Sequence, residues 1–331
     1  MEIKVPAKII LFGEHSVVYP GNSAILTTIN LFATFNSSVN NTERFKIVFP
    51  QFRGEVEIKL PNAITHYKKA QGLRDSYLQT NKIDELSLFV NDGMNFFKIL
   101  IGLISNKYPI KKFLTIKIDS DIPIGSGLGS SAVIAIGIIK SVLIHNEIQF
   151  SDEELFDLSK EMEDFQHGKS SGADPACIIS EGLILYEHKE NGERKFSKIE
   201  VPNKILDGLN LVFTGKPKET TGEMVNLVSN NNNKSDIFKK IQDLIKDLVD
   251  NDFHNFYNAI NKNGRLLEEL GIVNSKTLKF LEGIREQGGY CKISGAGGVS
   301  EDGSGISLIF NINKDSLQNQ LIQLNILQKW K

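Results

Sequence analysis

The sequence predicts an α+β fold, because segments with strand periodicity and segments with helical periodicity follow one another without regular alternation. Two glycine-rich loops interrupt this pattern, one before an apolar helix and one before a late strand. The 331 residues are enough for two domains. We expect an N-terminal domain over residues 1–190 and a C-terminal domain over residues 191–331.

Runs rich in Ile and Val predict the strands of the first half, and apolar residues at helical spacing predict its helices. The expected strands are 2–12, 24–35 and 113–118, with a hairpin over 44–60. The expected helices are 86–104, 130–145 and a third from Ser151 to about residue 166, where Ser151 and Glu154 form a capping pair. The polar stretch 61–80 is weakly patterned, and we expect an insertion or a mobile segment there.

The second half predicts more helix than strand. Expected strands are 209–213, 290–293 and 306–312, and expected helices are 223–229, 237–250, 252–270 and 275–287. The asparagine tract 230–233 predicts a solvated loop.

The composition is that of an ordinary globular protein, with 40% hydrophobic and 24% charged residues. A net charge of -2 gives no reason to expect a nucleic acid or a membrane surface as partner. The apolar run near the N-terminus ends at Gly13 and is too short for a secretory signal or a membrane span. Two cysteines, Cys177 and Cys291, without a CxxC pair favour a reducing compartment, so we expect a cytoplasmic protein.

The strongest chemical signal is the first glycine-rich loop. Glycines let backbone N–H groups approach an anion, and the helix behind the loop turns its positive end toward it. No GK[ST] ends the loop, so it is not the Walker pattern. A tight turn capped by serine is the structural alternative. The candidate phosphate-binding residues are Pro123, Gly125, Ser126, Gly127, Leu128, Gly129, Ser130 and Ser131.

A second segment combines a carboxylate near a helix end with another carboxylate beyond a small-residue loop. These are Glu163 and Asp174, with His167 between them. Phosphoryl transfer needs one carboxylate for a metal ion and a group that orients or deprotonates the attacking hydroxyl. The alternative is that Asp174 caps a helix while Glu163 is a solvated charge.

The third signal is Lys8, which lies among apolar residues of the first expected strand and is followed by Glu14 and His15. A buried lysine needs a carboxylate partner. Paired with Asp174, it would keep that aspartate ionised and help to neutralise a transferring phosphoryl group. An edge-strand lysine in water is the simpler reading of an isolated residue.

Together with the late glycine-rich run Lys292–Gly298, these segments resemble the motifs of the GHMP kinases, in family order and over nearly the whole chain. Within that family the opening AKIILFGEHSVV and the run HGKSSGAD are similar to those of mevalonate kinases. The resemblance implies a nucleotide-binding N-terminal domain, a ferredoxin-like C-terminal domain and a site in the cleft between them. It also implies ATP and Mg²⁺ as cofactors and transfer of a phosphoryl group to mevalonate.

The resemblance further implies roles for individual residues. Asp174 would be the base or orienting carboxylate, assisted by Lys8, and Glu163 and Ser131 would hold Mg²⁺. Gly295 and Gly297 would join the first loop around ATP. The substrate side would be shaped by Glu14, His15, His167 and Thr221.

The chain departs from the family pattern at three places. Ser170 stands where proline is usual, Gly222 stands where a basic residue is common, and the segment 299–305 adds Glu301 and Asp302 to the second glycine loop. We expect that added segment to be an exposed turn with its charges in water.

Two alternatives stay open on the sequence. Phosphomevalonate is another candidate acceptor, because Lys169, Lys216 and Lys218 could bind a second phosphate. A non-catalytic regulator could keep the same fold and bind a ligand without turnover. The sequence also leaves open whether the chain forms a homodimer.

Overall fold

The computed structural model describes residues 1–80, 83–92, 94–123, 125–201, 205–323 and 328–330. Its strands are β1 (Glu2–Phe12), β2 (Asn22–Val39), β3 (Phe45–Phe49), β4 (Gly54–Ile58), β5 (Leu114–Ser120), β6 (Leu183–His188), β7 (Arg194–Lys198), β8 (Asn210–Phe213), β9 (Tyr290–Ser294), β10 (Ile306–Phe310) and β11 (Gln328–Trp330). Its α-helices are α1 (Leu60–Thr80), α2 (Asp84–Asn91), α3 (Asn95–Lys107), α4 (Ser130–His145), α5 (Asp152–His167), α6 (Ala173–Ser180), α7 (Thr221–Ser229), α8 (Lys234–Asp250), α9 (Phe256–Glu269), α10 (Ser275–Glu286) and α11 (Lys314–Gln323). Short 3₁₀ turns are η1 (Ser16–Val18) and η2 (Pro50–Phe52).

The chain forms two compact units, which we call the first and the second unit. The first comprises residues 1–7, 29–122 and 129–181, and the second comprises residues 8–28, 123–128 and 182–331. The chain passes between them repeatedly, so β1 and β2 each contribute to both. The single boundary expected near residue 190 stays a prediction.

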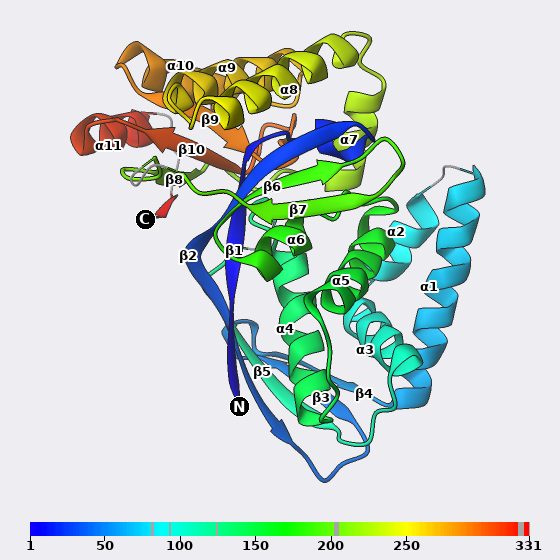
Figure 1. Ribbon diagram of the computed structural model, residues 1–331. Coiled ribbons are helices and arrows are strands. Elements are labelled where there is room, and N and C mark those ends of the chain that lie inside the picture. Colours follow the sequence, from blue (N-terminus) through cyan, green and yellow to red (C-terminus); the bar gives the residue numbers. More distant parts are fainter. Residues whose placement is uncertain (81–82, 93, 124, 202–204, 324–327, 331) are drawn as a thin grey trace. The chain divides into compact units, whose positions relative to one another are not determined.

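The first unit combines a sheet with the helices α1 to α6. The second half of β2 pairs antiparallel with β5, β5 pairs parallel with β3, and β3 and β4 form the expected hairpin. Helix α4 is mostly apolar, and it contacts β5, α5 and α6. A Cβ at Gly137 would lie 2.2 Å from the Phe35 ring, so this glycine lets α4 approach β2 closely. These helices lie side by side in Figure 1.

The segment 61–80, expected as an insertion or a mobile stretch, is helix α1, so that expectation was wrong. Its buried residues are only Ala63, Tyr67 and Ala70, which recur at helical spacing on the face that packs on α3. Gly102 of α3 permits this contact, because a Cβ there would lie 2.3 Å from the Ala63 carbonyl oxygen. A narrow apolar stripe on a long polar helix gives a weak periodic signal.

Two other expected helices differ from the observed ones. The segment 86–104, expected as one helix, forms the two helices α2 and α3. The apolar pattern continues across the break between Asn91 and Asn95, so it gave no sign of the division. The helix expected from residue 252 begins at Phe256, since Asp252 and Phe253 adopt left-handed backbone angles with φ of 48° and 60°.

In the second unit, the first half of β2 pairs antiparallel with β6, and β6 pairs with β7. A separate antiparallel sheet has the order β11-β8-β10-β9. Helices α9 and α10 pack on β9. The chain order strand, helices, strand, strand, helix, strand is ferredoxin-like, with α7 to α10 in place of one crossover helix. The expected α+β class and ferredoxin-like C-terminal part are confirmed.

Among the described residues, no single helix is both long and apolar enough to cross a membrane. In the same described part of the chain, one pair, α2 and α3, which is bent by 95°, reaches that length and composition jointly. Cys177 and Cys291 are both buried, and neither takes part in a disulfide within the described chain.

Candidate active site

In the first unit, the first turn of α4 presents a set of hydrogen-bond donors. Gly129 precedes the helix with φ 75°, and its carbonyl oxygen accepts the Val133 N–H at 2.9 Å. The N–H groups of the first turn therefore have no partner within the helix. Ser130 and Ser131 are half-buried, and neither hydroxyl bonds to another described residue. This turn can bind an anion, and a serine hydroxyl there can reach a phosphate or a metal ion.

Helices α5 and α6 bring the predicted acidic residues into the same unit. Glu163 is 4% exposed near the end of α5, and its Oε2 lies 3.7 Å from His167 Nε2. Asp174 is half-buried in the first turn of α6, which follows Gly172 at φ 85°. Helices α4, α5 and α6 contact one another (Figure 1), so Ser131, Glu163 and Asp174 lie on three packed helices.

The loop between His167 and Asp174 is held by Asp164, which sequence reasoning did not single out. Its Oδ1 accepts a hydrogen bond from the Ser170 N–H at 2.8 Å. Its Oδ2 accepts hydrogen bonds from the Arg74 guanidinium and the Lys160 ammonium, each at 2.8 Å. Asp164 is 3% exposed, so these donors compensate its buried charge. Ser170, which replaces the usual proline, thus supplies a backbone N–H that proline lacks.

In the second unit, Lys8 lies in β1 beside the first glycine loop. The Lys8 N–H donates to the Leu128 carbonyl oxygen at 3.2 Å, and the residue is 2% exposed. Of the two readings of Lys8, the structure supports the buried lysine and not the edge-strand lysine in water. Two residues further on, Ile10 exchanges hydrogen bonds with the hydroxyl of Ser294, at 2.9 and 3.1 Å. These contacts join β1 to both glycine-rich segments.

The two glycine-rich loops lie against each other. A Cβ at Gly127 would lie 3.0 Å from the Ser294 carbonyl oxygen, and one at Gly295 would lie 3.4 Å from Gly127 Cα. Gly125 and Gly127 are exposed with φ of 72° and 84°, whereas Gly295 and Gly297 are buried. Pro123, Ser126 and Leu128 complete the loop, and the Ser126 hydroxyl donates to the Pro123 carbonyl at 2.7 Å. Close backbone approach explains glycine at these positions.

Glu14 belongs to a buried polar cluster that the sequence did not reveal. Lys292 in β9 donates to Glu14 Oε1 and to the carbonyl oxygens of Ile10 and Leu11, at 3.2 and 2.9 Å. Asn263 in α9 donates to Glu14 Oε2 at 3.2 Å. Lys292 is 0% exposed and Glu14 1%. Burial lowers the pKa of Lys292, while the Glu14 carboxylate opposes that shift.

His15 follows directly in a strained conformation. Its φ is 60°, a left-handed value that non-glycine residues rarely adopt. Its Nε2 lies 3.0 Å from the Ala296 carbonyl oxygen, so Nε2 carries the proton and Nδ1 is the acceptor. Nδ1 is buried with no partner among the described atoms. Burial lowers the pKa of His15 to about 4, although the bond to Ala296 opposes the shift.

The shifted pKa predicts a specific pH dependence of stability. Between pH 6.5 and 4 the imidazole of His15 is protonated in the unfolded chain but stays neutral in the folded chain. Acidification over this range therefore favours unfolding. His15→Gln should reduce the loss of unfolding free energy between pH 7 and pH 4 by about 3 kcal/mol. Urea titrations at several pH values measure it. The exposed His254, changed to Gln, is the control; an unaltered pH slope in His15→Gln would contradict the assignment.

Thr221 and the added loop lie at the surface of the second unit. Thr221 is exposed at the start of α7, and its neighbour Thr220 provides the helix cap with Glu223. Glu301 and Asp302 are exposed, as expected. Asp302 pairs with Lys218 at 2.8 Å and raises the pKa of that lysine.

The predicted residues thus divide between the two units. The first unit holds Gly129, Ser130, Ser131, Glu163, His167 and Asp174. The second unit holds Lys8, Glu14, His15, Pro123, Gly125, Ser126, Gly127, Leu128, Thr221, Gly295 and Gly297.

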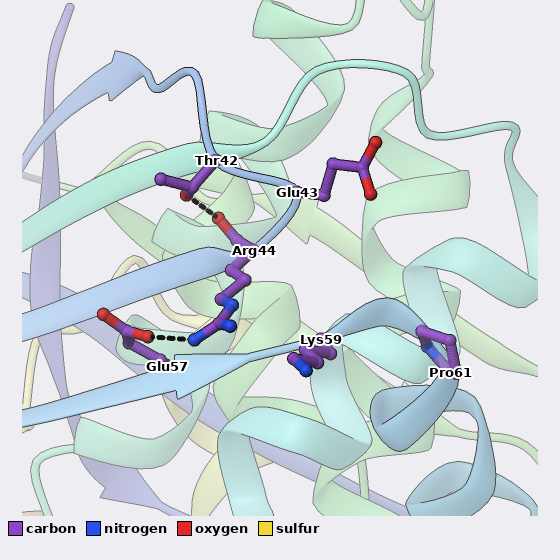
Figure 2. A pocket seen from close by; sticks show the side chains of 6 residues that line it. All are labelled: Thr42, Glu43, Arg44, Glu57, Lys59 and Pro61. Carbon is purple, nitrogen blue, oxygen red and sulfur yellow. Dashed lines mark hydrogen bonds and ion pairs between the residues drawn. The ribbon is translucent and has the colours of Figure 1, made fainter.

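A surface hollow of about 610 Å³ in the first unit contains none of these residues. Figure 2 shows its lining, from the turn after β2, from β4 and from the start of α1. Arg44 there already pairs with Glu57 at 2.9 Å. The hollow lacks the glycine backbone and the buried acids that the motifs supply, so we do not assign the chemistry to it.

Comparison with known proteins agrees with this fold and these motifs. The family model described as the GHMP kinases N terminal domain matches residues 95–182. A mevalonate kinase of Methanocaldococcus jannaschii is 30% identical over 98% of this chain and 96% of its own. A mevalonate kinase of Thermococcus onnurineus is 31% identical over 88% of this chain and 85% of its own. The crystal structure of the Methanococcus jannaschii mevalonate kinase superposes with a TM-score of 0.76 at 27% identity, covering 100% of this chain and 96% of that one.

The fold and the N-terminal domain match define a kinase of the GHMP class, which uses ATP to phosphorylate small molecules. The identity of 30% across almost the full length of both chains shows that this chain belongs to the mevalonate kinase family. The resemblance stated from the motifs is therefore confirmed.

Proposed function

We propose that this protein transfers the terminal phosphoryl group of ATP to the hydroxyl group of mevalonate, giving 5-phosphomevalonate. The observation that carries the proposal is the near full-length similarity to a mevalonate kinase, which includes the opening motif and the HGKSSGAD run. The first turn of α4 and the two glycine loops provide backbone donors of the kind that polyphosphates require.

Asp174 and Lys8 are the proposed catalytic residues. Asp174 accepts the proton of the attacking hydroxyl or orients that hydroxyl, while a new O–P bond forms and the bond to ADP breaks. The Lys8 ammonium stabilises the negative charge of the transferring group. Burial of Lys8 strengthens this effect, because a low local dielectric screens charge poorly.

Glu163 and Ser131 are the proposed Mg²⁺ ligands. A carboxylate and a hydroxyl are oxygen donors that suit Mg²⁺, which often takes its other ligands from phosphates and water. The described residues contain no cluster of three or more His, Cys, Asp or Glu side chains, and a metal held largely by phosphates needs none. Bound Mg²⁺ would neutralise phosphate charge during transfer.

The substrate side is proposed to include His167, Thr221, His15 and Glu14. His167 is half-buried on α5 and Thr221 is exposed on α7, so both side chains can reach a ligand. His15 and Glu14 are almost fully buried, and we propose that they shape this side chiefly through the backbone they fix. We also propose that the protein works in the cytoplasm, where buried thiols stay reduced.

The proposal is tested by measuring ADP release from ATP and Mg²⁺ with mevalonate, phosphomevalonate, homoserine or galactose as separate acceptors. We expect turnover with mevalonate alone. Turnover confined to phosphomevalonate would move the acceptor assignment to the alternative that Lys169, Lys216 and Lys218 leave open. ATP binding without turnover of any acceptor would instead support a ligand-binding regulator.

A further inference from the structure

We propose that Lys216 is a further phosphate-binding residue, whose ammonium group contacts the polyphosphate of the bound nucleotide beside the first glycine loop. This inference rests on the proposed kinase function and adds a residue to the nucleotide site. Lys216 follows β8, and it lies in the second unit together with the loop 123–128.

The side chain of Lys216 lies along Gly125. A Cβ at Gly125 would be 3.0 Å from Lys216 Cε, 3.4 Å from Cγ and 3.5 Å from Cδ. The aliphatic stem therefore follows the loop, and the ammonium group, one bond beyond Cε, lies at the loop's surface. Lys216 and Gly125 are both exposed, so a ligand can approach the charge and the loop backbone together.

Short backbone contacts fix the base of this lysine relative to the glycine loop. The Gly305 N–H donates to the Gly215 carbonyl at 3.0 Å, and the next N–H, of Ile306, donates to the Ser126 carbonyl at 3.2 Å. Gly215 has φ 131°, and a Cβ there would lie 1.7 Å from the Asp302 carbonyl oxygen. The two segments are thus bonded to the adjacent residues Gly305 and Ile306, so the backbone that carries Lys216 is fixed beside the loop.

The charges around Lys216 leave its ammonium available for a ligand. Lys218 is engaged by Asp302 at 2.8 Å, and Glu219 accepts the N–H and hydroxyl of Ser300 at 3.0 and 3.1 Å. Within the described chain Lys216 forms neither an ion pair nor a hydrogen bond. A cation with no acidic partner, next to exposed glycine backbone, suits an anion that carries several charges.

The test compares Lys216→Met with the control Lys218→Met. The control removes the same charge two residues further along the chain, from a lysine that already pairs with Asp302. Calorimetry without acceptor gives the dissociation constants of ATP, ADP and adenosine. We expect Lys216→Met to weaken ATP about tenfold or more, as the loss of a charged hydrogen bond does, and to leave adenosine within about twofold. Lys218→Met should leave ATP within about twofold.

Each other outcome overturns the inference. Equal weakening of ATP by both variants would indicate a general effect of surface charge. Unchanged ATP binding in Lys216→Met, with a raised KM for a phosphorylated acceptor, would assign the lysine to the acceptor instead. Because nucleotide binding is measured without turnover, failure of the proposed kinase function can be distinguished from failure of the proposed role of Lys216. An unmodified protein that binds no ATP contradicts the kinase, whereas normal ATP binding by Lys216→Met contradicts only this role.

Discussion

Asp174→Asn should lower kcat with mevalonate by about 10²–10⁴-fold, the range expected when a general base is removed. Asparagine has the same shape but neither accepts a proton nor carries the charge that orients the hydroxyl. Asp174 lies in the first turn of α6, where a carboxylate stabilises the helix by only about 0.3–1 kcal/mol. The folded protein should therefore survive, and its affinity for ATP should stay within about threefold because the phosphate-binding loops are unaltered.

Steady-state kinetics and equilibrium binding of ATP together measure this effect. The control is Asp152→Asn, which changes an exposed carboxylate in the first turn of α5 and should leave kcat unchanged. Lys8→Met should reproduce the pattern of Asp174→Asn, with turnover lost and ATP still bound. Near-normal turnover by Asp174→Asn would show that another group takes the proton.

The parts of the fold that the sequence predicted well are those with a local signal. Ser151 and Glu154 form the expected capping box, with the Ser151 hydroxyl accepting the Glu154 N–H at 3.1 Å. The helix expected over 130–145 has those bounds, because a continuous apolar run follows a glycine turn. In both cases the residues that determine the element lie within a few positions of it.

The parts that could not be predicted depend on contacts between distant segments. Helix α1 is fixed by its packing on α3, for which a narrow apolar stripe gives little warning. The pair of Glu14 and Lys292 joins residues from opposite ends of the sequence. Glu14 lies in the opening motif and Lys292 in the late glycine-rich run. Nothing in the sequence of either motif indicates that these two residues form an ion pair. The contact of Lys216 with Gly125 is hidden for the same reason.

The buried pair of Glu14 and Lys292 carries the largest expected effect on stability. Lys292→Met leaves the Glu14 carboxylate buried with only Asn263 as a polar partner, and breaking such a pair costs about 3–5 kcal/mol. Glu14→Gln should cost less, because the Ile10 and Leu11 carbonyls still receive the Lys292 ammonium. The double variant Glu14→Gln/Lys292→Met should be more stable than the sum of the single losses predicts, since it leaves no unpaired charge.

Equilibrium unfolding in urea measures these differences as a double-mutant cycle. Arg44→Met is the matched control, because Arg44 and Glu57 also form an ion pair, at 2.9 Å, but their side chains are 46% and 47% exposed. An exposed pair contributes no more than about 1 kcal/mol, so the contrast isolates burial from ion pairing as such. If Lys292→Met costs no more than Arg44→Met, the cluster does not hold β1 against β9. The positions of His15 and of the second glycine loop would then need another cause, because His15 comes directly after Glu14 in the chain and the second glycine loop comes directly after Lys292 and its strand.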